Sequence, residues 1–324
     1  MKKFLLGVCL FLSATLALAQ MPEKTWQEAK LAIQQGNFTQ AVQLLRPWAE
    51  RGDARGQYGL GVMHYHGLGV AQNDAQAREW WEKAAAQGSV DAQYNLGVMY
   101  RSGRGVEQDD AKAREWWEKA AAQGDAGAQN NLGWMYKNGR GGAQDDAKAR
   151  EWWEKAAALG FAQAQLSLGI MYESGQGVAQ DSAKACEWWE KAAAQGSVIA
   201  QSSLGWMYHD GRGVVQDYVK ARKWWEKAAA QGDAESQYNL GVMYRDGRGV
   251  AKDYAKAREW WEKAAAQGFS EAQYNLGVMY RDGRGVAKDL FKAQEWFEQA
   301  AAQPENSEGV RKAQQALEEM RQRR

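Results

Sequence analysis

The chain has 324 residues, of which 41 are Lys or Arg and 40 are Asp or Glu, so its formal net charge is only +1. A chain this balanced lacks the excess of positive charge by which proteins bind nucleic acid. We therefore expect no nucleic-acid partner. The length alone would allow two or three ordinary domains.

The first 19 residues differ in composition from the rest. Lys2 and Lys3 precede an apolar stretch at residues 4–18, and Ala-Leu-Ala at residues 17–19 is a small-residue cleavage motif. This pattern predicts a secretory signal peptide at residues 1–19 that is cleaved after Ala19. Cleavage removes two of the 41 basic residues and leaves 39 against 40 acidic ones. No later stretch has the roughly 20 apolar residues of a membrane-spanning helix. We therefore expect a periplasmic or secreted protein without a membrane span.

One cysteine, Cys186, remains after the predicted cleavage. A single cysteine cannot form an internal disulfide, so no disulfide framework holds the fold together. Sister positions in the repeat described next carry arginine, so we interpret Cys186 as a surface position that has drifted. A disulfide between two molecules remains an alternative.

A pattern of 36 residues occurs seven times without insertion or deletion, and its clearest copy runs from Ser89 to Gly124. The copies begin at Asp53, Ser89, Asp125, Phe161, Ser197, Asp233 and Phe269. A fixed period of this size is typical of a solenoid, in which each unit buries its apolar face against its neighbours.

Each copy predicts two helices. The first spans about residues 91–101, where Ala92, Leu96 and Met99 share one helical face. Gly97 lies beside that face and recurs in every copy, which indicates that another helix crosses too closely for a Cβ. After a Gly-rich turn, Asp109 is the expected N-cap of the second helix, whose apolar face carries a pair of tryptophans.

The two ends depart from the repeat. Residues 20–52 predict a shorter hairpin, similar to a tetratricopeptide hairpin, and residues 53–304 hold the seven copies. In residues 305–324, Val310, Ala313, Leu317 and Met320 form a narrow apolar stripe. One apolar face with polar surroundings is what a C-terminal capping helix needs.

The combination of LGxMY, GxGV, D and AxxWWxKAAxQG over residues 53–304 resembles the Sel-one-like repeat (SLR) family, of the exported bacterial type, in the tetratricopeptide-repeat superfamily. The resemblance implies an all-α fold, a right-handed α/α superhelical solenoid of helix-turn-helix repeats with a concave groove. It also implies a binding scaffold or adaptor, with roles in envelope assembly, signalling or host interaction. One cysteine-rich branch of the family is proposed to act on penicillin-like compounds. The present chain lacks its paired cysteines, so that activity is not transferred.

The residue patterns do not point to catalysis. The Gly-x-Gly turns follow a helix rather than a strand, so they do not fit a dinucleotide site. His64, His66 and His209 have no companions at metal-ligand spacing. We therefore expect no enzyme, no metal and no cofactor.

Candidate binding residues are those that vary between copies while the core repeats. Three columns on the first helix, at the positions of Tyr94, Val98 and Arg101, point away from the Ala92 face. Large aromatic and basic side chains on a rigid wall are typical anchors for peptides. The predicted groove consists of Tyr58, Tyr94, Arg101, Trp134, Lys137, Trp206, His209, Tyr238, Arg245, Tyr274 and Arg281. Packing between adjacent repeats is an alternative for Trp134 and Trp206, and neutral drift of solvated positions would explain the variation equally well.

The favoured hypothesis is an exported, non-enzymatic scaffold that binds a protein or peptide in its groove as a monomer. One alternative is an envelope enzyme that acts like a β-lactamase or on a cell-wall peptide, by family analogy alone. A third is a structural factor in the assembly of envelope or surface machinery.

Overall fold

The computed structural model describes residues 20–304 and 307–322, which form seventeen α-helices and no strand. The predicted signal peptide at residues 1–19, with its cleavage site, lies outside the described residues. The chain divides into two compact units, residues 1–144 (unit 1) and 145–324 (unit 2). Within the described ranges, no helix is both long and apolar enough to cross a membrane.

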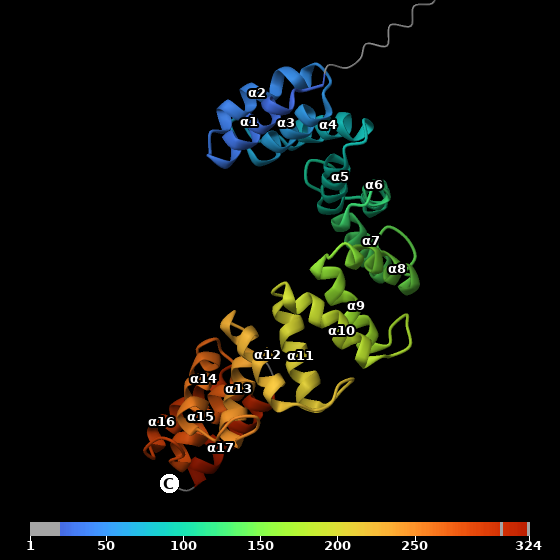
Figure 1. Ribbon diagram of the computed structural model, residues 1–324. Helices are drawn as coiled ribbons and strands as arrows, with labels where there is room; N and C mark the ends of the chain where they lie inside the picture. The colour runs from blue at the N-terminus through green and yellow to red at the C-terminus, as the bar shows by residue number, and fades with distance from the viewer. Residues whose placement is uncertain (1–19, 305–306, 323–324) are drawn as a thin grey trace, which may run out of the picture. The chain divides into compact units, whose positions relative to one another are not determined.

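Unit 1 is a row of helices in which consecutive members pack against each other (Figure 1). Its helices are α1 (Glu23–Gln34), α2 (Phe38–Glu50), α3 (Ala54–His66), α4 (Asp74–Ala86), α5 (Val90–Ser102), α6 (Asp110–Ala122) and α7 (Ala126–Asn138). The α3–α4 and α5–α6 hairpins are the first two copies of the 36-residue pattern.

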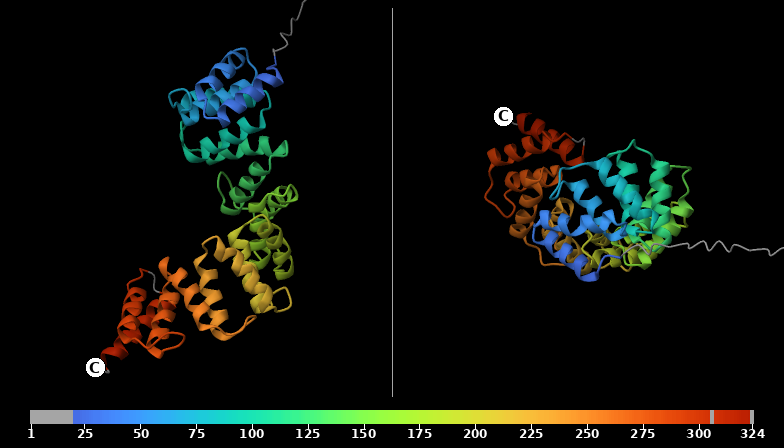
Figure 2. Two further views of the ribbon diagram at one scale, coloured as in Figure 1. Left: turned by 60° about the vertical axis from the view of Figure 1, so that its left-hand side comes forward. Right: turned by 90° about the horizontal axis from the view of Figure 1, so that it is seen from above.

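Unit 2 is built in the same way, and the two views of Figure 2 show its consecutive helices side by side. Its helices are α8 (Asp146–Ala158), α9 (Ala162–Ser174), α10 (Ser182–Ala194), α11 (Val198–Asp210), α12 (Tyr218–Ala230), α13 (Ala234–Asp246), α14 (Tyr254–Ala266), α15 (Ser270–Asp282), α16 (Leu290–Ala301) and α17 (Glu308–Gln322). The predicted fold class is therefore confirmed as an all-α solenoid of helix-turn-helix repeats.

The turn inside each hairpin follows the predicted chemistry. After α5, Gly103 and Gly105 take φ of 71° and 72°, the left-handed region that a side chain disfavours. Asp109 then caps α6, since its Oδ1 accepts a hydrogen bond from the Lys112 amide at 2.9 Å. The six other predicted caps likewise accept an amide hydrogen bond in their own copies: Asn73, Asp145, Asp181, Asp217, Asp253 and Asp289.

The recurring glycine of the first helix makes room for an indole ring. A Cβ on Gly97 would lie 2.4 Å from Nε1 of Trp117, the second tryptophan of α6. Trp117 is 1% exposed, and its Nε1 donates a hydrogen bond to the Tyr94 carbonyl at 3.1 Å. The close approach predicted at this glycine is thus made by a side chain of the second helix. Gly241 and Trp261 repeat the arrangement in unit 2.

The first tryptophan of each pair is only half-buried. Trp116 lies beneath Lys119, whose Nζ is 3.9 Å from the ring centroid, and Trp188 lies beneath Lys191 at the same distance. A cation over an indole face is attracted by the quadrupole of the ring. Of the two tryptophans, therefore, only the second belongs fully to the core.

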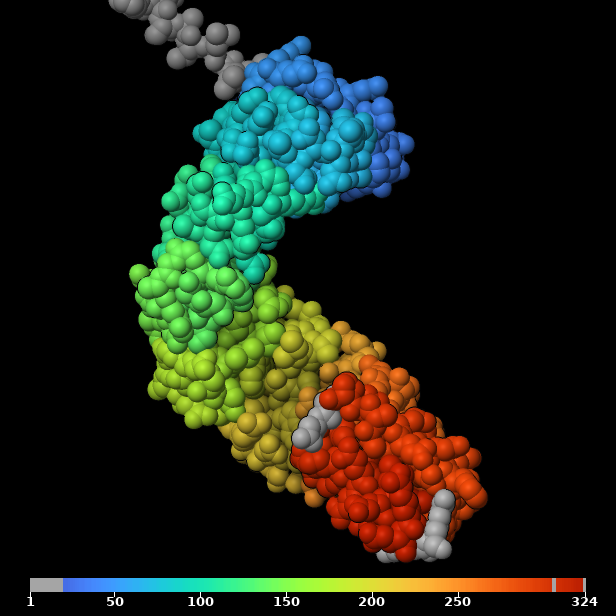
Figure 3. Space-filling model, turned by 180° about the vertical axis from the view of Figure 1, so that it is seen from behind, coloured from blue at the N-terminus to red at the C-terminus, as the bar shows by residue number. Residues whose placement is uncertain are grey.

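A buried glutamine column, which the sequence reasoning did not single out, links neighbouring hairpins. Gln93 on α5 donates Nε2 to the Ala85 carbonyl on α4 at 3.2 Å, and its Oε1 accepts from Gln123 Nε2 at 2.8 Å. In unit 2, Gln237 forms the same two bonds with Ala229 and Gln267. Each of these glutamines thus links the preceding hairpin to the C-terminal end of the second helix in its own hairpin. Figure 3 shows the successive repeats of unit 1 as adjoining bands of colour.

The two ends of the described chain close these units. In unit 1, the α1–α2 hairpin packs on α3, and α2 continues through Pro47 to Glu50. In unit 2, α17 packs on α15 and α16. It buries Val310, Ala313 and Ala316, while Leu317 and Met320 pack at the edge of the same cluster.

Candidate functional site

The predicted tyrosine column lies mainly between repeats. In unit 1, Tyr94 is half-buried, and its ring centroid is 6.4 Å from that of Trp117. A Cβ on Gly127 of α7 would lie 3.1 Å from the Tyr94 ring, so the ring covers the start of the next repeat. Tyr58 is also half-buried, and burial raises its pKa. This column therefore contributes only part of each ring to the surface.

In unit 2, two members of this column are more deeply buried. Leu166 and Ser202 occupy it in two copies and are 3% and 8% exposed. Tyr238 lies against Phe269, with ring centroids 5.2 Å apart, and burial raises the Tyr238 pKa. Tyr274 lies 5.6 Å from Phe297. These positions pack neighbouring repeats together, which explains why they accept different residues of suitable volume.

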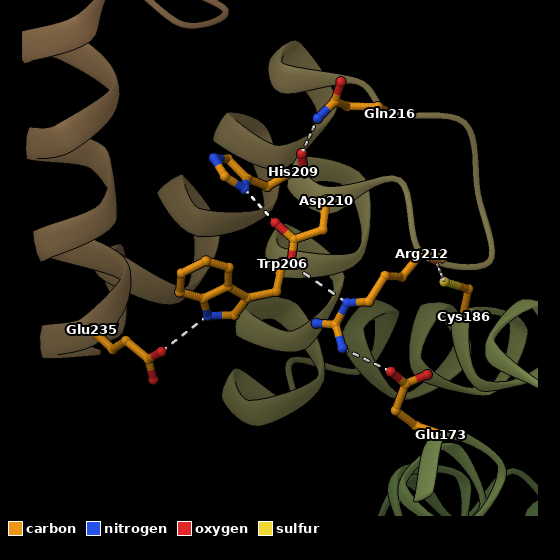
Figure 4. Close-up of polar contacts among 8 residues, drawn as sticks. All are labelled: Glu173, Cys186, Trp206, His209, Asp210, Arg212, Gln216 and Glu235. Atoms are coloured by element: carbon orange, nitrogen blue, oxygen red, sulfur yellow. Dashed lines mark hydrogen bonds and ion pairs between the residues drawn. The ribbon is translucent and has the colours of Figure 1, made fainter. Parts of the chain in front are cut away.

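Trp134 and Trp206 occupy the same repeat position in different surroundings. Trp134 in unit 1 is 38% exposed, and the guanidinium of Arg101 lies 4.4 Å from its ring centroid. Trp206 in unit 2 is half-buried, with its ring 5.2 Å from that of Trp225. Its Nε1 donates a hydrogen bond to Glu235 Oε1 at 3.0 Å, as Figure 4 shows. Contacts within unit 2 thus occupy Trp206, whereas Trp134 presents much of its surface to solvent.

The column at the position of Arg101 also differs between the two units. In unit 2, Arg245 donates two hydrogen bonds to Asp246, at 2.6 and 3.0 Å, and Arg281 donates two to Asp282, at 2.8 and 3.4 Å. These arginines lower the pKa of each aspartate. His209 Nδ1 lies 2.7 Å from Asp210 Oδ1 (Figure 4).

Arg101 of unit 1 lacks this arrangement. Arg101 is exposed and forms no ion pair with the described residues; its recorded contact is with Trp134. Lys137 on α7 is half-buried. The residue after Arg101 is Ser102, whose Oγ donates to the Val98 carbonyl at 2.8 Å.

An open pocket of about 500 Å³ lies in unit 1 between the α5–α6 hairpin and α7. Four of its lining residues were singled out from the sequence, namely Tyr94, Val98, Arg101 and Trp134. The others are Ser102, Gln108, Asp110, Trp117, Asn131 and Arg140. Arg140 Nη1 lies 3.6 Å from Asp110 Oδ2. Two guanidinium groups and one carboxylate therefore line the pocket.

The ion pair in this pocket was missed because its two members belong to a turn and to a second helix. Asp110 directly follows the cap of α6, and Arg140 lies in the loop after α7. One signal was available in the sequence: Ser102 stands where three later copies carry aspartate.

The interpretation of Cys186 as a surface position is wrong. Cys186 on α10 is 2% exposed, and its thiol lies 3.8 Å from the Arg212 carbonyl (Figure 4). Burial, with Glu190 and Glu173 nearby, raises the pKa of the thiol to about 11. The arginines at sister positions are themselves half-buried, so a small apolar residue fits the site.

No metal-binding cluster of three His, Cys, Asp or Glu side chains occurs in the part of the chain that the structure describes. Carboxylates at the helix starts serve as caps, and the half-buried arginines of the second helices pair with glutamates one turn on, as Arg114 does with Glu118 at 2.9 Å. The pocket of unit 1 is suited to holding a ligand by stacking and ion pairing.

Comparison with known proteins agrees with this architecture. A family model described as Sel1 repeat matches residues 31–53, 54–89, 90–125, 126–161, 162–197, 198–233, 234–269 and 270–304. The match at 31–53 falls on the N-terminal hairpin that the sequence set apart from the seven copies. A comparison with curated proteins found no match.

Two solved structures are similar over nearly the whole chain. A protective antigen present in uropathogenic Escherichia coli strains, which displays an SLR fold, is 37% identical with a TM-score of 0.84 and covers 93% of this chain and 67% of its own. A Sel1 repeat protein from Oxalobacter formigenes is 36% identical with a TM-score of 0.68 and covers 90% of this chain and 86% of its own. The repeat matches and these two likenesses show that the chain belongs to the Sel1 repeat family.

Proposed function

We propose that this protein is an exported, non-enzymatic scaffold that binds a protein or peptide through the first-helix surface of its repeats. The observation that carries the proposal is the unit 1 pocket, where the exposed Trp134 stands on a frame whose core is repeated almost without change. Aromatic side chains that are held rigidly and partly exposed are the usual anchors of protein interfaces.

Export is part of the proposal. Residues 1–19 have the composition of a signal peptide, and one similar structure is described as a protective antigen of a pathogenic Escherichia coli. Both observations support a periplasmic or secreted location, with a role in envelope assembly, signalling or host interaction.

The experiment compares what the purified protein captures from an envelope extract before and after Trp134→Ala. Val215→Ala is the matched control, because Val215 is 88% exposed in a loop of unit 2 and is not one of the pocket residues. We expect quantitative mass spectrometry to show a partner that both wild type and Val215→Ala retain and that Trp134→Ala loses at least fivefold, a change in affinity of about 1 kcal/mol.

Circular dichroism of all three proteins serves as the control that the helices are intact. N-terminal sequencing of the exported protein tests whether cleavage falls after Ala19. If Trp134→Ala recovered every protein as well as wild type does, the pocket would have no part in binding.

A further inference from the structure

The side chain of Arg101 differs from its counterparts in unit 2 in one respect. Arg245 and Arg281 are each followed by an aspartate that accepts two hydrogen bonds from the guanidinium. Arg101 is followed by Ser102, and it forms no ion pair within the described residues. The copy that begins at Ser89 thus has the cation but lacks the neighbouring carboxylate that Arg245 and Arg281 have on their own helices.

The position of Arg101 is nevertheless defined. Its guanidinium lies 4.4 Å from the ring centroid of Trp134, which belongs to the next repeat. A guanidinium stacked on an indole remains free to donate hydrogen bonds from its edge, and its planar fork matches the two oxygens of a carboxylate. Stacking therefore reduces the freedom that the side chain would lose on binding such a group.

The surroundings suit a carboxylate side chain. The pocket has a volume of about 500 Å³, which is enough for one or two side chains of a peptide. Arg140 pairs with Asp110 at 3.6 Å, so this cation is balanced and Arg101 supplies the remaining positive charge. Tyr94 and Trp134 offer aromatic surface beside it.

We propose that the unit 1 pocket binds an acidic side chain of a peptide segment, with Arg101 as the cation and Trp134 as the stacking platform. This inference rests on the proposed function and names the chemistry of its ligand. It also assigns Ser102 a role: by leaving Arg101 without an aspartate of its own, it keeps the guanidinium available to the ligand.

The test uses random twelve-residue peptides displayed on phage and selected on the full protein, followed by synthesis of the enriched peptides. We expect enrichment of Asp or Glu, and about fivefold weaker binding when that residue becomes Asn or Gln, the size of one partly exposed ion pair. Binding should also weaken as NaCl is raised from 50 to 500 mM.

Matched variants locate the effect. Ser102→Asp supplies the carboxylate that Arg245 and Arg281 already have, so it should reduce peptide affinity about fivefold. Ser102→Asn has the shape of Ser102→Asp without the charge, so it separates the effect of the carboxylate from that of added bulk and should bind the peptide more tightly than Ser102→Asp. Arg101→Gln should lose the preference for acidic residues. Peptides with a free and an amidated C-terminus distinguish a side-chain carboxylate, which we expect, from the terminal one.

The outcomes separate the two levels of the argument. If no peptide is enriched on the protein, both the proposed function and this inference fail. If peptides bind without an acidic residue, or bind Ser102→Asp as tightly as Ser102→Asn, scaffold binding stands and the acidic-residue site is wrong. Dependence on a free C-terminus alone would also contradict the side-chain assignment.

Discussion

Arg101 in unit 1 and Arg245 in unit 2 occupy the same position of the same repeat, yet one is open to solvent beside an exposed tryptophan and the other is held by Asp246. Trp134 and Trp206 show the same contrast, since Glu235 accepts the indole hydrogen of Trp206. The backbone and the core of the two units are alike. Single substitutions on the first helices therefore decide whether these side chains bond to other residues of the array or are presented to a ligand.

The substitutions with the largest expected effect test whether the glycine of the first helix packs on the second tryptophan in the same way in both units. We expect Gly97→Ala and Gly241→Ala each to destabilise the protein by about 2 kcal/mol, because the new Cβ would lie 2.4 and 2.3 Å from the indole nitrogens of Trp117 and Trp261. The roughly 1 kcal/mol that alanine gains in helix propensity is smaller than this clash. Urea denaturation followed by circular dichroism measures the change.

Gly124→Ala is the control for this pair. Gly124 has a φ of 90° with no heavy atom within 4 Å of a built Cβ, so only backbone strain of about 1 kcal/mol is expected. Stabilisation by Gly97→Ala would mean that the indole moves aside. A large difference between Gly97→Ala and Gly241→Ala would break the claim that the frames are equivalent.

An intermediate effect tests the glutamine links. Gln93→Leu and Gln237→Leu should each lower the free energy of unfolding by about 1 kcal/mol, since each removes a buried side-chain hydrogen bond to an alanine carbonyl, which still accepts a bond from a glycine amide. The control is Gln123→Leu, which removes only the bond between the two glutamine side chains and leaves the bond from Gln93 to the Ala85 carbonyl, so it should cost less than Gln93→Leu. Equal losses from Gln93→Leu and Gln123→Leu would show that the bond to the alanine carbonyl contributes nothing.

The smallest effect concerns pH and is confined to unit 2. The hydrogen bonds from Arg245 and Arg281 lower the pKa of Asp246 and Asp282 in the folded protein. A depressed folded pKa gives stability that is present above the unfolded value of about 3.9 and is lost as the pH falls through the folded value. Because these pairs are partly exposed, we expect less than about 1 kcal/mol in total.

The double variant Asp246→Asn/Asp282→Asn isolates this effect. Its urea midpoint should lie below that of wild type at pH 7, and the two midpoints should converge as the pH is lowered below about 3.9. The caps Asp109, Asp145 and Asp181, whose pKa values are also lowered, are present in both proteins and cancel in the difference. A difference that is the same at pH 7 and in acid would show that the two ion pairs contribute nothing.

Local rules allowed most of the frame to be predicted from the sequence. The cap at Asp109 and the turn at Gly103 depend on residues within a few positions, so spacing alone identifies them. The surface depends on partners in other repeats. Trp206 meets Glu235 29 residues away, and the burial of Cys186 depends on the turn that carries Arg212. Such contacts have no periodic signature, because they arise where the copies differ.

The half-buried indole of each second helix has a wider consequence. Lys119 above Trp116 and Lys227 above Trp224 place an ammonium group between an aromatic face and water. A long lysine side chain can cover apolar surface while its charge stays hydrated. Lengthening the array by another hairpin therefore adds its own hydrophilic cover along with its tryptophans. Each copy thus maintains its own solubility, and the number of copies can change without creating an exposed aromatic surface that would cause aggregation.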